Sequence, residues 1–210
     1  MSLLETDRRF GVMSEALASR ASKAYAPRAQ IGERLETAVS VVVRARDDLD
    51  FLLIKRATSE LDPWSGHMAL PGGRWEPTDS GLLQTAERET LEETGVDLQR
   101  VGSPLGRLND VATAGPHLPK LLIAPYVFGV PADTEALVAS HEVERVYWVP
   151  LDTLRSADTL TSVEIPLPGG SRMFPSYDVV GEHIWGLTHR ILAHFLEVYP
   201  GSELEKLGST

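Results

Sequence analysis

The chain has 210 residues, enough for one domain with a sizeable core, and its composition (42% hydrophobic, 24% charged) is typical of a globular protein. A net charge of −10 argues against a polymeric nucleic-acid partner, because nucleic-acid backbones favour clustered Lys and Arg. The chain contains no cysteine, which excludes disulfides, thiolate metal sites and a cysteine nucleophile and favours a cytoplasmic location. No apolar run approaches the roughly 20 residues of a membrane span, so no membrane partner is expected.

The first half of the chain predicts a helix followed by two strands and a second helix. Residues 1–27 lack a secretory apolar stretch and favour an amphipathic helix that ends in a turn at Ala26-Pro27. β-Branched and apolar residues predict adjacent strands at 37–46 and 50–56. A short apolar run at 67–70 ends at Pro71-Gly72-Gly73, and a polar loop follows. The next helix is predicted over 82–94, with Asp79 or Ser80 as its N-cap and Gly95 as its stop signal.

The second half continues the alternation of strands and helices. Strands are predicted at 121–130 and 145–149, with a short helix at 151–155. A hairpin is expected over 163–177 around Pro168-Gly169-Gly170, and a final helix over 182–199. The chain has no internal repeat, low-complexity tract or obvious linker, so it predicts one α/β domain.

Three acids crowd the end of the helix predicted at 82–94. Glu89, Glu92 and Glu93 fall within an arc of roughly 100°, and an opposite, buried side is expected to hold Leu83, Ala86, Thr90, Leu91 and Thr94. Like charges at this spacing repel one another, and the negative end of the helix dipole adds to the cost. A hard divalent cation would relieve both effects, since carboxylate oxygens are its preferred ligands. The alternative is a solvated acidic face paired with Arg88 or Arg100.

The segment from Gly73 to Val96 resembles the Nudix box, G-x5-E-x7-R-E-U-x-E-E-x-G-U, in which U is a bulky aliphatic residue. Arg88-Glu89 and Glu92-Glu93, followed by Gly95, match its distal half at every charged and glycine position. Two features depart from the box. Asp79 stands where the family usually has Glu, with eight residues instead of seven before Arg88, and Thr90 replaces an aliphatic residue.

The resemblance implies a Nudix fold, an α/β/α sandwich with a mixed β-sheet and a catalytic loop-helix-loop. It implies three segments: an N-terminal helical extension over 1–35, a Nudix hydrolase domain over 36–200 and a C-terminal tail over 201–210. The extension is expected to form a dimer contact, a lid or a frayed end, and homodimers are common in the family.

An upstream stretch resembles the branch of the family that cleaves coenzyme A (CoA) and its acyl derivatives, whose signature is LLTxRSA-x3-R-x3-G-x3-FPGG. The aligned residues 52–73 share its spacing and include Arg56 and Gly66, but Asp62 replaces Arg and Leu70 replaces Phe. The resemblance implies hydrolysis of CoA or acyl-CoA to 3′,5′-ADP and (acyl-)phosphopantetheine. The alternatives are a Nudix hydrolase for ADP-ribose, NADH or another nucleotide, and a non-catalytic Nudix-fold nucleotide-binding module.

The resemblance also assigns roles within the predicted site. Glu89, Glu92 and Glu93 are the expected ligands of Mg²⁺ or Mn²⁺, with the Gly73 carbonyl as a further oxygen. Arg88 and Asp79 are expected to support the loop and the helix without binding metal.

The general base and the substrate contacts are expected from a wider set of residues. The base is Glu92 or Glu93 of the box or an acid outside it, Glu142 ahead of Glu144, while His141 is expected to be a bystander. Substrate contacts are expected from one of the two neighbours Lys55 and Arg56 and from the residues His67, Gly72 and Trp75. Trp75 is the tryptophan expected to stack on a base, and the other three are expected to pack in the protein.

Overall fold

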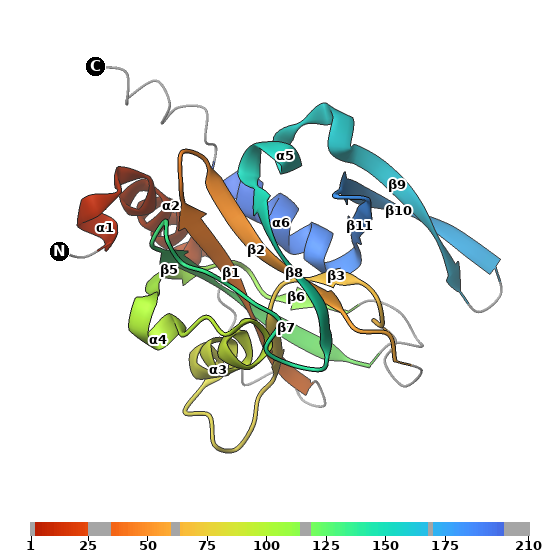
Figure 1. Cartoon of the computed structure of the whole chain (residues 1–210), viewed down its shortest axis with the longest axis horizontal. Helices are drawn as coiled ribbons and strands as arrows, with labels where there is room; N and C mark the ends of the chain where they lie inside the picture. The colour runs from red at the N-terminus through yellow and green to blue at the C-terminus, as the bar shows by residue number, and fades with distance from the viewer. Residues whose placement is uncertain (1–2, 25–34, 60–63, 114–118, 168–169, 200–210) are drawn as a thin grey trace.

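The protein was analysed as a computed structural model that describes residues 3–24, 35–59, 64–113, 119–167 and 170–199. A mixed sheet lies at its centre, with the strand order β3-β2-β1-β7-β5 (Figure 1). Its longer strands are β1 (Leu35–Ala45), β2 (Leu49–Arg56), β5 (Ser103–Arg107), β7 (Leu121–Val130) and β8 (Val143–Pro150). Three short strands pair along them: β3 (Met68–Ala69) with β2, β4 (Gly72–Arg74) with β1, and β6 (Val111–Ala112) with β7. β1 and β7 run parallel, whereas the remaining pairs are antiparallel.

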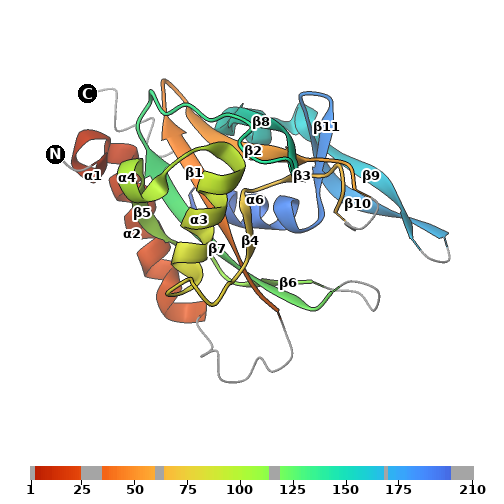
Figure 2. The ribbon, with the colours of Figure 1, turned by 60° about the horizontal axis from the view of Figure 1, so that its bottom comes forward.

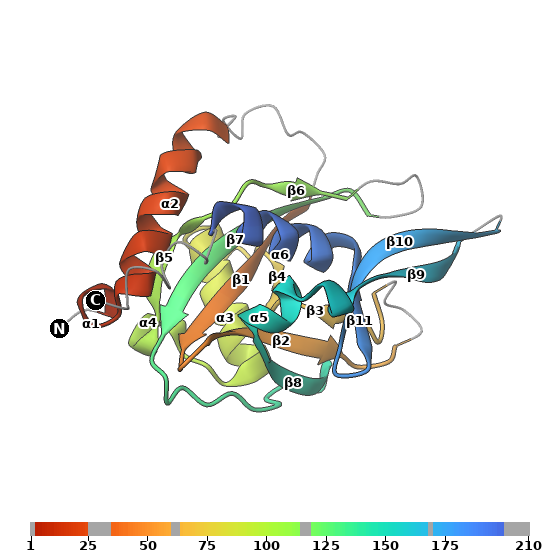
Figure 3. The same ribbon diagram turned by 90° about the horizontal axis from the view of Figure 1, so that it is seen from above.

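Helices cover both faces of this sheet. On one face lie α3 (Leu82–Thr94) and α4 (Leu98–Val101), and Figure 2 shows α3 crossing in front of β1 and β7. The other face carries α6 (Gly186–Val198), seen against the sheet in Figure 3, together with α2 (Arg8–Ala24) and α5 (Leu151–Arg155). Two further short helices are α1 (Leu3–Thr6) and the 3₁₀ turn η2 (Ala157–Thr159). This arrangement confirms the predicted α/β/α sandwich.

The alternating side chains of β1 build a separate core on each face. Val39, Val41 and Val43 pack with residues of α6 and α2, whereas Ala38 and Val42 pack with α3 and α4. A strand buried on both faces favours a nearly continuous β-branched run, which explains the sequence of β1.

A second sheet of three strands, the ribbon sheet, projects from the rest of the protein. It consists of β9 (Leu160–Leu167), β10 (Gly170–Val179) and β11 (Glu182–Trp185), in the order β11-β10-β9. β11 contacts β3, which joins this ribbon to the edge of the main sheet. Figure 1 shows β9 and β10 extending away from the other elements.

The structure confirms most of the predicted elements, including the strands near 37–46, 50–56, 121–130 and 145–149, the helices at 82–94 and 151–155, and the hairpin. The N-terminal helix is present as α1 and α2, but its predicted turn at 26–27 and the tail at 201–210 lie outside the described residues. The predicted start of the last helix is wrong, because residues 182–185 form β11 and Gly186, with φ of 65°, turns the chain into α6. Within the described residues, no helix is long and apolar enough to cross a membrane.

The N-cap predicted for α3 is also wrong. Gly81 occupies that position, and no side chain caps the helix. Asp79 is not available as a cap, because its carboxylate accepts hydrogen bonds from the Glu76 N–H and from Thr85 and Arg88. Ser80 instead donates its N–H to Gln84 Oε1 at 2.6 Å.

Candidate active site

Two consecutive glycines bring β4 close to both β1 and α3. Gly72 has φ of 153°, and a Cβ on it would lie 2.3 Å from the carbonyl oxygen of Ala38 on the paired strand. A Cβ on Gly73 would lie 2.2 Å from Oε1 of Glu89. Glycine is therefore required twice, once for the strand pairing and once to admit the carboxylate of Glu89.

Glu93 is a buried carboxylate facing this glycine strand. Its Oε2 accepts a hydrogen bond of 2.9 Å from the Gly72 N–H, and Arg56 Nη1 lies 4.0 Å from its Oε1. Burial raises the pKa of Glu93 to about 8; the charges of Glu89 and Glu142 act in the same direction, against the Gly72 N–H and Arg56. One hydrogen bond and one distant guanidinium compensate little of the cost of burying this carboxylate. Glu93 is therefore expected to bind a proton or a cation.

The buried and exposed faces of α3 differ from those predicted from the sequence. The buried side of α3 carries Ala86, Thr90 and Thr94, as predicted, but also Glu93, whereas Leu91 is 44% exposed. Leu83 is likewise exposed. The hydrophobic pattern fails here because the buried face meets β4 with its polar N–H groups as well as the apolar side chains of the sheet.

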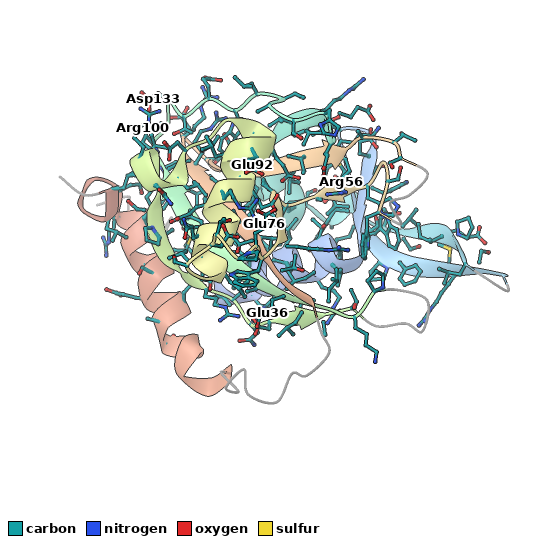
Figure 4. All side chains as sticks on the ribbon, turned by 90° about the horizontal axis from the view of Figure 1, so that it is seen from below. Glu36, Arg56, Glu76, Glu92, Arg100 and Asp133 are labelled. Atoms are coloured by element: carbon teal, nitrogen blue, oxygen red, sulfur yellow. The ribbon has the colours of Figure 1, made fainter. Side chains whose placement is uncertain are left out.

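Glu89 and Glu92 both contact the guanidinium of Arg88. Nη1 of Arg88 donates to Glu89 Oε1 at 3.1 Å and to Glu92 Oε2 at 3.2 Å. Burial raises the pKa of Glu89 while Arg88 lowers it, and the charges of Glu92 and Glu142 raise it further. Figure 4 shows Glu92 on the outer side of α3, facing away from the sheet, with Arg56 across from it at the end of β2.

Asp79 holds the other side of the same guanidinium. Its two oxygens accept hydrogen bonds from Nε and Nη2 of Arg88 at 3.0 and 3.1 Å, and Oδ2 also accepts from Thr85 Oγ1 at 2.9 Å. Hydrogen bonding to Arg88, although opposed by burial, lowers the pKa of Asp79 to about 2. Nη2 of Arg88 further donates to the carbonyl of Arg74, so one arginine ties the loop, β4 and α3 together.

Comparison with known proteins places this arrangement in a family. Residues 34–167 match the family model described as the NUDIX domain. The chain belongs to the Nudix family. Nudix hydrolases are among the proteins that it resembles.

Two relatives match more than half of the chain. An uncharacterized Nudix hydrolase, NudL of Yersinia pestis, is 31% identical over 162 residues, or 76% of this chain and 77% of that protein. An uncharacterized Schizosaccharomyces pombe protein is 38% identical over 117 residues, which cover 54% of this chain and 36% of the yeast protein. The chain therefore spans about a third of the length of the yeast relative.

Two solved structures are among those that match the chain. A MutT/nudix family protein from Enterococcus faecalis is 17% identical with a TM-score of 0.48, and the match covers 95% of this chain and 75% of that chain. The NUDIX domain of Shewanella oneidensis NrtR, complexed with ADP ribose, is 24% identical with a TM-score of 0.45, over 66% of this chain and 86% of that chain.

The loop between β7 and β8 is fastened to the end of the Nudix helix α3. The N–H of Leu137 donates to the carbonyl of Thr94 at 3.0 Å, and the N–H of Ala139 donates to that of Glu93 at 3.2 Å. Further along, the carbonyl of Glu142 accepts a hydrogen bond of 2.8 Å from Ala57. The loop thus satisfies helix carbonyls that otherwise lack partners and brings Glu142 toward the acids of the helix.

The two acids considered as an external base have different surroundings. Glu142 is exposed, and its charge raises the pKa of both Glu89 and Glu93. Glu144 forms ion pairs with Lys55 at 3.6 Å and with Arg145 at 3.8 Å. His141 is exposed beside them.

The residues predicted to contact substrate lie in three places. Arg56 is the neighbour directed at Glu93, whereas Lys55 forms a 2.5 Å ion pair with Glu182 of β11. The His67 ring contacts the edge of Trp185. Trp75 is 43% exposed in the loop before α3, where its Nε1–H donates to the Asp79 carbonyl.

Trp185, which the sequence assigned to packing, contacts His67, one of the residues predicted to meet substrate. It ends β11, and its ring borders both His67 and Phe174. In the sequence, Trp185 lies in the segment 184–188, which also resembles the CoA branch, but an aromatic residue there does not by itself separate packing from binding.

The donor set suits a hard divalent cation. Glu89 and Glu93 supply carboxylate oxygens, and the missing Cβ of Gly73 leaves room for the carboxylate of Glu89. As the side chains lie, no three His, Asp or Glu residues in the described parts of the chain form a ready cation cage. The reason is visible at Arg88, which engages both Glu89 and Glu92.

Proposed function

We propose that the chain hydrolyses CoA or acyl-CoA to 3′,5′-ADP and (acyl-)phosphopantetheine with Mg²⁺ or Mn²⁺. The observation that carries this proposal is the position of Arg56, the arginine shared with the CoA-branch signature, 4.0 Å from the buried Glu93. Leu70, one departure from that signature, is 4% exposed in the hydrophobic core. Its change from Phe therefore alters core packing instead of a surface that meets substrate.

Glu89, Glu92 and Glu93 are the proposed metal ligands, with the Gly73 carbonyl as an additional oxygen. A bound divalent cation supplies neutralisation of the diphosphate and orientation of the attacking water. Arg88 pairs with both Glu89 and Glu92, so Glu92 would have to turn away from Arg88 to bind a metal. Asp79 keeps Arg88 in place throughout, through its two hydrogen bonds.

Glu142 is the proposed general base, with Glu92 and Glu93 as the alternatives. Its support is electrostatic, since its charge acts on both Glu89 and Glu93 while Glu144 is paired with Lys55. Arg56, His67, Gly72 and Trp75 are the proposed substrate contacts. Arg56 meets the diphosphate, because a planar guanidinium suits phosphate oxygens.

A second substrate class is ADP-ribose, NADH or another nucleotide, favoured by the acid Asp62 at a signature arginine position, which lies outside the described residues. A non-catalytic binding module is the alternative of another class. The buried Glu93 argues against it, because a protein without catalysis gains nothing from a desolvated acid.

Purified protein with Mg²⁺ or Mn²⁺ separates these possibilities. It is offered CoA, acyl-CoA, ADP-ribose, NADH and nucleoside triphosphates, and the products are resolved by chromatography. Release of 3′,5′-ADP supports the proposal, whereas turnover of ADP-ribose without CoA favours the second substrate class. Tight nucleotide binding without turnover of any compound favours the binding module.

A further inference from the structure

Three rings form a row at the junction of β3 with the ribbon sheet. The centroids of His67 and Trp185 lie 4.8 Å apart with an interplanar angle of 66°, and those of Trp185 and Phe174 lie 5.3 Å apart at 46°. All three side chains are half-buried, so each keeps part of its surface open to solvent. At the far end, the guanidinium of the exposed Arg172 lies 5.5 Å from the Phe174 ring centroid.

The row begins at His67, the residue opposite Arg56. The N–H of Arg56 donates to the His67 carbonyl at 3.0 Å, continuing the register that pairs Ile54 with Ala69. Directly opposed residues of antiparallel strands project from the same face, so His67 stands on the Arg56 side of the sheet. Arg56 lies 4.0 Å from Glu93, so the row starts at the residue that pairs with an arginine of the proposed reaction centre.

The packing that anchors the ribbon sheet to the core does not explain the position of all three rings. Tyr177 and Val179 of β10, with Ile184 of β11, are buried in the core cluster beneath α6. Phe174 alternates with these two β10 residues along the strand and therefore projects from the opposite face, the face of Trp185. The core thus holds the ribbon through one face, while the rings stand on the other.

We propose that His67, Trp185 and Phe174 form a stacking platform for the base of the nucleotide substrate. This inference rests on the proposed function, since it takes the diphosphate to lie at Arg56 and Glu93. Because the rings are inclined at 66° and 46° to one another, a base attached to that diphosphate would stack on the face of one ring with its neighbours alongside, and Arg172 places a cation at the end of the platform. The chemical class selected is a nucleotide with an aromatic base, independent of the second group on the diphosphate.

Equilibrium binding tests the platform without any catalytic step. The probes are AMP and ribose 5-phosphate, which share the phosphate and the sugar but differ in the base, titrated by calorimetry. The wild type is expected to bind AMP more tightly, and Phe174→Leu, which keeps apolar bulk, to weaken AMP binding on the order of tenfold. The variant leaves the affinity for ribose 5-phosphate unchanged.

Met173→Ala is the matched control, since Met173 adjoins Phe174 on β10, is 55% exposed and projects from the other face. It should bind both probes as the wild type does. If ribose 5-phosphate binds as tightly as AMP to the wild type, or if Phe174→Leu weakens both equally, the platform is wrong. His67→Leu, at the other end of the row, repeats the test should Phe174→Leu fold poorly.

The two proposals fail in distinguishable ways. If Phe174→Leu weakens AMP binding and no diphosphate is hydrolysed, the platform stands and the proposed function is wrong. If CoA is hydrolysed but AMP binding does not depend on Phe174, the proposed function stands and the platform is overturned.

Discussion

Glu93 is the residue whose surroundings differ most from what its chemistry prefers. It is 4% exposed, and one backbone N–H and a guanidinium at 4.0 Å are its nearest compensation. A carboxylate in such a place is expected to bind a proton or a cation. The pH dependence of stability that arises from Glu93 therefore tests the structure of the site.

In metal-free protein, Glu93→Gln should increase stability at alkaline pH. The pKa of Glu93 is about 8 in the folded chain against an ordinary value of 4.5, so the native state binds the extra proton between these values. Wild-type stability therefore falls as pH rises from about 4.5 to about 8 through this group. Glutamine does not titrate, and the variant should gain at least about 1 kcal/mol in unfolding free energy at pH 8.

Urea unfolding at pH 4.5 and pH 8 in the presence of chelator measures this difference. The stabilisation of the variant should vanish at pH 4.5. Equal stability of the two proteins at pH 8 would show that Glu93 is solvated and not buried. Adding Mg²⁺ should then raise the melting temperature of the wild type more than that of the variant.

Asp79→Asn should destabilise the protein, with a different pH dependence. The pKa of Asp79 is lowered to about 2, so its contribution to stability is present above its ordinary value of 3.8 and is lost as pH falls toward 2. At pH 7 the variant should lose about 1–2 kcal/mol of unfolding free energy, and the difference should shrink below pH 3.8.

Asp133→Asn, a change at an exposed loop acid, is the control and should shift the unfolding free energy by less than about 0.5 kcal/mol. Denaturant titrations from pH 2.5 to 7 carry the comparison. If Asp79→Asn loses as much unfolding free energy at pH 2.5 as at pH 7, the loss comes from packing and not from the charge pair with Arg88.

The sequence predicts which acids gather on one side of the helix better than it predicts where the side chains of the helix point. Spacing alone gathers Glu89, Glu92 and Glu93 on one arc, but it assigns the exposed Leu91 to the buried side and overlooks the burial of Glu93. Hydrophobic periodicity assumes that apolar side chains choose the face. Here a long-range contact with Gly72, 21 positions earlier, decides the direction of Glu93.

At the scale of elements, β4 and α3 approach one another through Gly73. Gly73→Ala would place a Cβ 2.2 Å from Glu89 Oε1, and the flexible end of Glu89 has to move away. The fold can absorb that movement, but the carboxylate cannot keep its position. Turnover should therefore fall about 100-fold, while the melting temperature stays within a few degrees of wild type.

Two other glycine substitutions give the matched comparison in steady-state assays and thermal melts. Gly81→Ala meets no atom within 4 Å and should preserve activity. Gly72→Ala meets the Ala38 backbone at 2.3 Å and should destabilise the fold itself. Full activity in Gly73→Ala would mean that the position of Glu89 does not matter for the reaction.

Elements with strong local signals were predictable, and those defined by distant partners were not. β1, β2, α3 and β7 follow from β-branched runs, helical periodicity and the αL stop at Gly95. β5 contains Pro104 and Gly106, poor strand formers, and is a strand because it pairs with β7 across a register shift. β11 was mistaken for helix because its pairing with β10 is set by tertiary structure.

At the scale of the whole molecule, the N-terminal helix α2 shares a hydrophobic core with the main sheet and α6. Phe10, Met13 and Leu17 of α2 are buried in the cluster that also contains residues of β7 and α6. This apolar face of α2 is thus used within the chain. A dimer contact or a lid formed by the segment would have to use its other faces.

Phe10→Ala should cost about 3–5 kcal/mol of unfolding free energy, since Phe10 is fully buried and a Cβ on Gly129 would lie 3.0 Å from its ring. Activity per folded molecule should be unchanged, because Phe10 packs in the cluster on the face opposite α3. Urea unfolding monitored by circular dichroism measures the loss. A cost below about 1 kcal/mol would indicate that α2 is a separable extension.

The most direct measurement is turnover of a nucleoside diphosphate derivative by the wild type and by Glu93→Gln, each with Mg²⁺ or Mn²⁺ and with chelator. Wild-type protein should hydrolyse at least one compound of the CoA, ADP-ribose and NADH panel only when the metal is present. Glu93→Gln should be folded and lose at least about 100-fold in kcat, as expected for loss of a group needed in the transition state. Wild-type rates in the variant, or full activity in chelator, would contradict a metal-dependent hydrolase centred on Glu93.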